Sequence, residues 1–196
     1  PDHGGGGREQ AGRTGGQIGL SDIACPPVIA IENVLPERVL IGEVELRDLY
    51  GASGRLAAVT VEGASVEIFD ATFVGQPGRG AIAASSGGNV HVTRLRTSGF
   101  GTPVRAANAS LTVEESTLSG ATQSAVAFEA GASGSVSRSL LVANATAVLA
   151  TSGAAVSLDH LTVVGPGVGV DVRERTAGSG GGDVVGHSLI AWEAEP

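Results

Sequence analysis

Three short segments of the sequence carry ionisable side chains at equivalent places: VELRDLYG, VEIFDATFVG and VHVTRLRTSG. Stacked carboxylates can hold a hard cation such as Ca²⁺, and closely spaced ones shift each other's pKa toward acid–base chemistry. If the segments lie side by side, three roles are predicted. The metal ligands are Glu45, Asp48 and Glu67, the catalytic groups are Asp70, His91 and Arg94, and the substrate-binding groups are Arg47 and Tyr50.

A repeat of roughly 22 residues would bring these segments together. Its apolar anchors, spaced by 21 to 27 residues, are Leu46, Ile68, Val92, Val113, Val136, Leu158 and Val185. The residue two places before the anchor is large and apolar in five of the seven repeats. That alternation is typical of a β-strand with one buried face. Seven places after the anchor, four repeats have glycine, which favours a turn.

Each repeat thus predicts three short strands separated by Gly, Asn or Ser turns, and parallel strands of successive repeats lie about 4.8 Å apart. The composition agrees, because only 3% of residues are aromatic while Gly reaches 31. A thin core of Val, Ile, Leu and Ala suits a solenoid. The predicted fold class is all-β: a single-stranded right-handed parallel β-helix of about seven coils with three short strands per coil.

An ionisable residue follows every predicted anchor by two places: Asp48, Asp70, Arg94, Glu115, Arg138, His160 and His187. One interpretation is a solvated ladder of charges that helps to fix the register between coils. The other is a functional site in the N-terminal coils, formed by the residues assigned above. Asp159 and His160, with His187 on the next coil, form a further candidate pair for proton transfer or metal binding.

The ends of the chain differ from the repeat. Residues 1–22 are Gly-rich with few apolar side chains, which predicts a disordered or linker segment. The β-helix domain is expected to occupy residues 23–196. Within it, residues 23–43 are expected to form an irregular first coil or an N-terminal cap, and residues 174–182 a loop insertion before the last coil.

The repeating segments resemble those of right-handed parallel β-helix repeat proteins, the pectin-lyase-like superfamily. The resemblance lies in LTVEESTLSG (residues 111–120) and VSLDHLTVVG (residues 156–165), each followed by an Ala-Val or Gly-Val step at Ala125-Val126 and Gly169-Val170. It covers roughly Val39 to Trp192. It implies the β-helix fold, but that superfamily includes lyases, hydrolases, epimerases and adhesins. In its lyases, carboxylates on one strand face hold Ca²⁺ and an Arg or Lys acts as base.

The net charge of the chain limits the kinds of partner that it could bind. A net charge of −8 and a pI near 4.9 argue against nucleic acid or an anionic membrane surface, and also against an acidic polysaccharide unless Ca²⁺ bridges the two. No apolar run is long enough for membrane insertion. We expect a non-catalytic extracellular or cell-surface domain with a structural, adhesive or glycan-binding role, because the repeat is regular and aromatic side chains are few.

The alternative is a polysaccharide lyase, hydrolase or epimerase, or a fragment of one, acting on a uronic-acid or neutral glycan. The expected partners are a polysaccharide or another protein chain at the open solenoid ends. No cofactor is expected, and Ca²⁺ is the ion that the carboxylate cluster would take.

Overall fold

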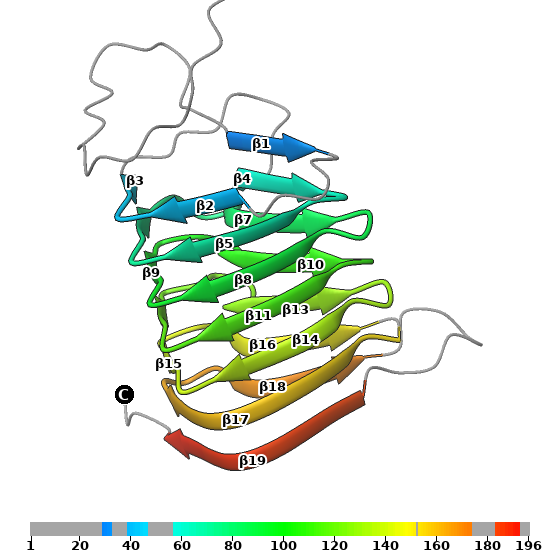
Figure 1. Cartoon of the computed structure of the whole chain (residues 1–196). Helices are drawn as coiled ribbons and strands as arrows, with labels where there is room; N and C mark the ends of the chain where they lie inside the picture. Colours follow the sequence, from blue (N-terminus) through cyan, green and yellow to red (C-terminus); the bar gives the residue numbers. More distant parts are fainter. Residues whose placement is uncertain (1–28, 33–38, 47–56, 152, 174–182, 193–196) are drawn as a thin grey trace, which may run out of the picture.

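The computed structural model describes residues 29–32, 39–46, 57–151, 153–173 and 183–192. In these ranges every regular element is a strand, and all pairings are parallel. The strands wind into a β-helix whose coils stack in chain order (Figure 1). This confirms the all-β fold class. Five complete coils are described, with an incomplete coil at each end, compared with about seven predicted. None of the described residues forms a helix long and apolar enough to cross a membrane.

Each coil contributes up to three strands. The first strands are β1 (Ile29–Glu32), β4 (Ala57–Glu62), β7 (Gly80–Ser85), β10 (Val104–Ala107), β13 (Val126–Glu129), β16 (Thr146–Thr151) and β18 (Val168–Arg173). The second strands are β2 (Val39–Gly42), β5 (Ser65–Phe69), β8 (Asn89–Thr93), β11 (Ser110–Glu114) and β14 (Ser133–Ser137). The third strands are β3 (Glu45–Leu46), β6 (Thr72–Val74), β9 (Arg96–Ser98), β12 (Thr117–Ser119) and β15 (Leu140–Val142).

The last two coils join their second and third strands. β17 (Ala155–Val164) pairs with both β14 and β15, and β19 (Asp183–Trp192) pairs with β17. The first strands therefore form one seven-stranded sheet, while the second and third strands form a twelve-stranded sheet, in which eleven strands follow one path and β19 pairs with β17 beside it. The coil bends between its second and third strands, and this bend positions the candidate site.

The core consists of columns of like side chains. The column Val59, Ile82, Val104, Val126, Val148 and Val170 runs in register through the first strands, as the repeat predicts. All but Val170, which is partly buried at the end of the sheet, have 0% exposure. Alternating side chains point outward, which is the period-two pattern of a half-buried strand. Burial in this protein comes mainly from small aliphatic residues stacked coil upon coil.

The predicted anchor of the first coil is wrong. Ile41, not Leu46, pairs with Ile68, and Leu46 pairs with Phe73 on the third strand. The register is shifted by five residues, so Glu43 takes the place predicted for Asp48. The sequence contained a sign of this error: counting from Leu46 puts Gly51 into a column that otherwise holds larger residues, mostly apolar, whereas counting from Ile41 puts Leu46 there. A register that places Leu46 rather than Gly51 in this column buries more apolar surface.

The predicted anchor of the last coil is also wrong, by one residue. Leu158 pairs with Gly186 rather than with Val185. The same shift pairs Val156 with Val184, which replaces the Asp183 that the predicted register would have turned inward. His187 consequently pairs with Asp159, so the predicted pairing of His160 with His187 is wrong as well.

The predicted segment boundaries stay predictions. Residues 1–22 and the loop insertion at 174–182 lie outside the described residues. Within 23–43, predicted as an irregular first coil or cap, the described residues form β1 and β2, which pair with β4 and β5.

Candidate functional site

The bend between the second and third strands places one ionisable residue of each coil on the surface. Glu43, Asp70, Arg94, Glu115, Arg138 and His160 occupy this position, which we call the bend column. All six are exposed, and all six have φ between 46° and 54°. This left-handed conformation costs a non-glycine residue about 1–2 kcal/mol. It recurs in the six successive coils from Glu43 to His160, so it belongs to the bend of these coils and projects each side chain outward.

Backbone hydrogen bonds support the bend column from coil to coil. The amide of Asp70 donates to the carbonyl of Thr93 at 3.1 Å, and the amide of Arg94 donates to the carbonyl of Glu114 at 3.0 Å. Glu115 and Arg138 make the equivalent bonds. Because the ladder continues through the bend, successive side chains of the column are held about one strand spacing, roughly 4.8 Å, apart.

Two hydroxyl groups hold the bend from inside. Ser116 and Ser139, the buried residues that follow Glu115 and Arg138, stack on Leu95. Ser116 Oγ accepts from the Leu95 amide at 3.1 Å and donates to the Glu114 carbonyl at 2.7 Å. Ser139 Oγ accepts from the Ser116 amide at 3.1 Å and donates to the Ser137 carbonyl at 2.7 Å. Each serine thus satisfies a buried amide of the preceding coil.

Ion pairs link the bend column along its length. Arg94 donates from Nε and Nη2 to the two carboxylate oxygens of Asp70, each at 2.6 Å. This hydrogen bonding lowers the pKa of Asp70 below its ordinary value and raises that of Arg94. Two coils further on, Arg138 donates to Glu115 at 3.2 Å and to Glu114 at 2.8 Å. Among these residues, the ladder of charges therefore consists of one Arg–Asp pair and one arginine shared by two glutamates.

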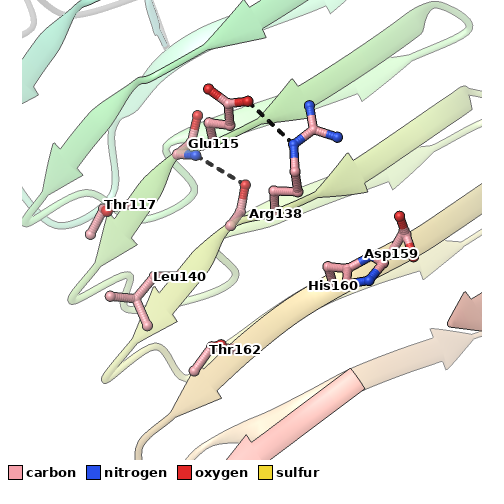
Figure 2. A pocket seen from close by; sticks show the side chains of 9 residues that line it. Glu115, Thr117, Arg138, Leu140, Asp159, His160 and Thr162 are labelled. Atoms are coloured by element: carbon pink, nitrogen blue, oxygen red, sulfur yellow. Dashed lines mark hydrogen bonds and ion pairs between the residues drawn. The ribbon is translucent and has the colours of Figure 1, made fainter. Parts of the chain in front are cut away.

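Three open hollows lie along the outside of the bend. One, of about 530 Å³, is lined by Glu115, Arg138, Asp159, His160 and the neighbouring hydroxyl residues (Figure 2). A second, of about 520 Å³, is lined by Asp70, Thr72, Arg94, Arg96, Glu115 and Thr117. A third, of about 380 Å³, is lined by Thr72, Phe73, Arg96, Thr97, Ser98, Thr117 and Ser119. The hollows share residues and together form a trough, named the bend trough below, that runs from Asp70 to His160.

One wall of the bend trough is the outward row of the third strands. Thr72, Arg96, Thr117, Leu140 and Thr162 pair in register along this row. Figure 2 shows Thr117, Leu140 and Thr162 following one another on successive coils, opposite Glu115, Arg138 and His160. At the end of the trough, His160 Nδ1 lies 2.7 Å from Asp159 Oδ1. The surface offered to a ligand therefore combines hydroxyl groups with paired charges.

The predicted site residues fall into separate places. Asp70 and Arg94 lie together in the bend trough. His91 lies on the outer face of β8, with Nε2 at 3.4 Å from the Thr93 hydroxyl and 3.9 Å from a Glu114 carboxylate oxygen. Glu67 pairs with His91 across coils. The three predicted catalytic residues are thus divided between the trough and the face of the second strands.

Of the predicted metal ligands, Glu45 and Glu67 lie on the third and second strands, respectively. Glu45 pairs with Thr72 on the third strands, and Leu40 is the residue of the first coil that pairs with Glu67. This follows from the five-residue shift of register in the first coil. The described residues contain no group of three or more His, Cys, Asp or Glu side chains placed to hold a metal ion. Asp48, Arg47 and Tyr50 lie outside the described residues, so the prediction as a whole stays untested.

The trough residues missing from the predicted site are those of the third strands. Thr72, Arg96 and Thr117 stand four places after their anchors, and the sequence shows this row once the correct register is known. The signal is a polar residue in most coils at that position.

Comparisons with known proteins add no relative. No family model matches the chain, and searches of the curated proteins and of the solved structures also found no match. The class of protein is therefore defined by the structure alone: this chain is a parallel β-solenoid.

Proposed function

We propose that this protein is a non-catalytic, extracellular or cell-surface β-helix domain that binds a polysaccharide in the bend trough. The observation that carries the proposal is the trough itself, which repeats hydroxyl and charged side chains over successive coils. A polymer of repeated sugar units can present repeated hydroxyl groups to such a row. The proposal also places the chain with the pectin-lyase-like superfamily, on the strength of the repeating segments described above.

The electrostatics of the trough support binding rather than catalysis. A general acid or base works best with a pKa near the operating pH. The carboxylate of Asp70 has both oxygens bonded to Arg94, and its pKa is lowered, so it stays ionised at neutral pH. Glu115 is likewise engaged by Arg138. Asp70 and Glu115 are thus suited to holding arginine side chains in place, while Asp159, the third carboxylate of the trough, lies 2.7 Å from His160.

The burial of the aromatic side chains suggests how the sugar would be held. Among the described residues, Phe73, Phe100 and Phe128 are buried, and the half-buried Phe69 of β5 does not line the trough, so none of these rings is offered to a ligand there. Recognition would then depend on hydrogen bonds from hydroxyl and guanidinium groups, each worth about 0.5–1.5 kcal/mol after exchange with water. Binding would be weak per sugar and would grow with the number of coils that a chain covers.

The test is affinity electrophoresis of the whole chain through gels containing soluble neutral and acidic glycans, with two matched variants. Thr117→Val removes a trough hydroxyl, and Thr112→Val removes a hydroxyl from the outer face of β11 in the same coil. We expect Thr117→Val to weaken retardation by a bound glycan several-fold and Thr112→Val to leave it unchanged.

Two results would overturn the proposal. Equal behaviour of the two variants, or no retardation by any glycan, removes the trough as a binding site. The appearance of new reducing ends or unsaturated products on incubation with a glycan would instead support the enzymatic alternative, a lyase or hydrolase, and sugar epimerisation seen by NMR would support an epimerase.

A further inference from the structure

Arg96 differs from the other arginines whose partners the structure defines. Arg94, Arg105, Arg138 and Arg173 each donate to at least one carboxylate. The guanidinium of Arg96 has no hydrogen bond or ion pair with any residue in the described part of the chain. Its side chain is exposed, and it belongs to β9, in the middle of the bend trough.

The surroundings of Arg96 are built from hydroxyl groups. Thr72 and Thr117 are its direct partners in the ladder on either side, so their outward side chains lie about 4.8 Å from its own. These three residues are shared by two adjacent hollows of the trough. Ser98, two places along the same strand, lines one of them. A cation flanked by hydroxyl donors is the arrangement that accepts an oxyanion.

The nearby carboxylates do not neutralise Arg96. Asp70 is bonded through both oxygens to Arg94, and Glu115 is bonded to Arg138. Both carboxylates are thus bonded to the arginine of a neighbouring coil. The Arg96 charge is left without a counterion among the described residues. A ligand that supplies a carboxylate or sulfate group would complete the pattern of pairs along the trough.

We propose that Arg96, with Thr72 and Thr117, forms an oxyanion subsite, so that the glycan bound in the trough carries carboxylate or sulfate groups. This inference rests on the proposed function and specifies the ligand for the same site. It holds against the net charge of −8, because charges more than about 8 Å away are largely screened at physiological ionic strength. The anionic group of the glycan would contact the Arg96 guanidinium directly, so this attraction outweighs the screened repulsion from distant acidic side chains.

The experiment uses three polymers with the same backbone: hydroxyethyl cellulose, carboxymethyl cellulose and cellulose sulfate. Retardation of the whole chain in gels containing each polymer gives three dissociation constants. We expect the two anionic polymers to bind about tenfold more tightly than the neutral one, as a charge-assisted hydrogen bond would give. The two anionic arms also show whether carboxylate or sulfate is preferred.

Variants assign the effect to Arg96. Arg96→Gln should abolish the preference for the anionic polymers, so that this variant binds the three polymers with about the same affinity as one another. Arg173→Gln makes the same change in net charge on β18, on the other sheet, and should preserve the preference.

Each remaining outcome has one meaning. If the unaltered chain binds all three polymers with equal affinity, the oxyanion subsite is overturned and the proposed function remains in place. An equal loss in the two variants also overturns the subsite, because it assigns the preference to net charge. Failure of all three polymers to bind counts against the proposed function itself.

Discussion

Gly134 provides the sharpest test of how the core of this β-helix is packed. It occupies β14 at a place where other coils have Val or Leu, and it pairs with Leu111 of the coil before. Its φ is 155°, and an added Cβ would overlap the Leu111 carbonyl oxygen. The ring of Phe128 lies 3.0 Å from that Cβ position and is fully buried. Phe128 has Ala106 and Ala150 as ladder neighbours, so the large ring occupies space that small residues leave around it.

We expect Gly134→Ala to destabilise the protein by about 3 kcal/mol. Overpacking a closed core costs about 1–3 kcal/mol, and relief of the overlap must move β14 away from β11, which weakens ladder hydrogen bonds worth about 1 kcal/mol each. The melting temperature should fall by roughly 6–12 °C for a chain of this size. Thermal unfolding followed by circular dichroism measures this shift, with urea denaturation as a second measurement.

Two other glycines serve as controls. An added Cβ at Gly169 meets no atom within 4 Å, so Gly169→Ala should be neutral or stabilise by less than about 1 kcal/mol. Gly87 also faces open space but has φ of 80°, so Gly87→Ala should cost about 1–2 kcal/mol. Adding Phe128→Leu should not rescue Gly134→Ala, because the closest atom is backbone. Equal stability of Gly134→Ala and Gly169→Ala, or rescue by Phe128→Leu, would refute the reasoning.

Two further predictions concern the bend. Ser139→Ala leaves the buried amide of Ser116 without its acceptor, so it should lower the free energy of unfolding by about 1–3 kcal/mol in urea. Ser110→Ala, at an exposed site, should change it by less than about 0.5 kcal/mol, and similar effects of the two would contradict the role of Ser139. The pKa of Asp70 is lowered chiefly by its hydrogen bonds to Arg94. The pKa of Asp70 is lower in the folded than in the unfolded chain, so its pair with Arg94 stabilises the fold at pH values above the ordinary pKa of 3.8. This stabilisation is lost as the pH falls through the lowered pKa of the folded state. Carboxyl NMR titration should show the Asp70 pKa rising toward 3.8 in Arg94→Gln, and an unchanged pKa would exclude Arg94 as the cause.

The sequence predicts the central coils well because their columns keep the same chemistry. Val92, Val113, Val136 and Leu158 pair as their spacing indicates, and each of these coils presents a charged or imidazole side chain two places later. A one-residue slip would turn every buried side chain outward, so the apolar pattern leaves one choice of register.

At the two ends the apolar pattern leaves several choices of register. In the first coil, Ile41 and Leu46 are both apolar, so either could be the anchor. In the last coil, Val184 and Val185 are both apolar, so the apolar pattern does not distinguish two registers that differ by one residue. Only the fit of all columns together selects Ile41 and Gly186, and this moves Glu45 away from Glu67.

By itself, the sequence determined the solenoid, the strands of its central coils and the charged column on its surface, because these follow from a period of two within strands and of about 22 between them. The tertiary structure decided which charges pair and which do not. The bend gives Asp70 and Glu115 left-handed backbones and aims them at Arg94 and Arg138, while Arg96 lies one strand further on, between two threonines. The spacing of residues along the sequence does not give the direction of the bend between the second and third strands, because that direction is set only when the coil folds.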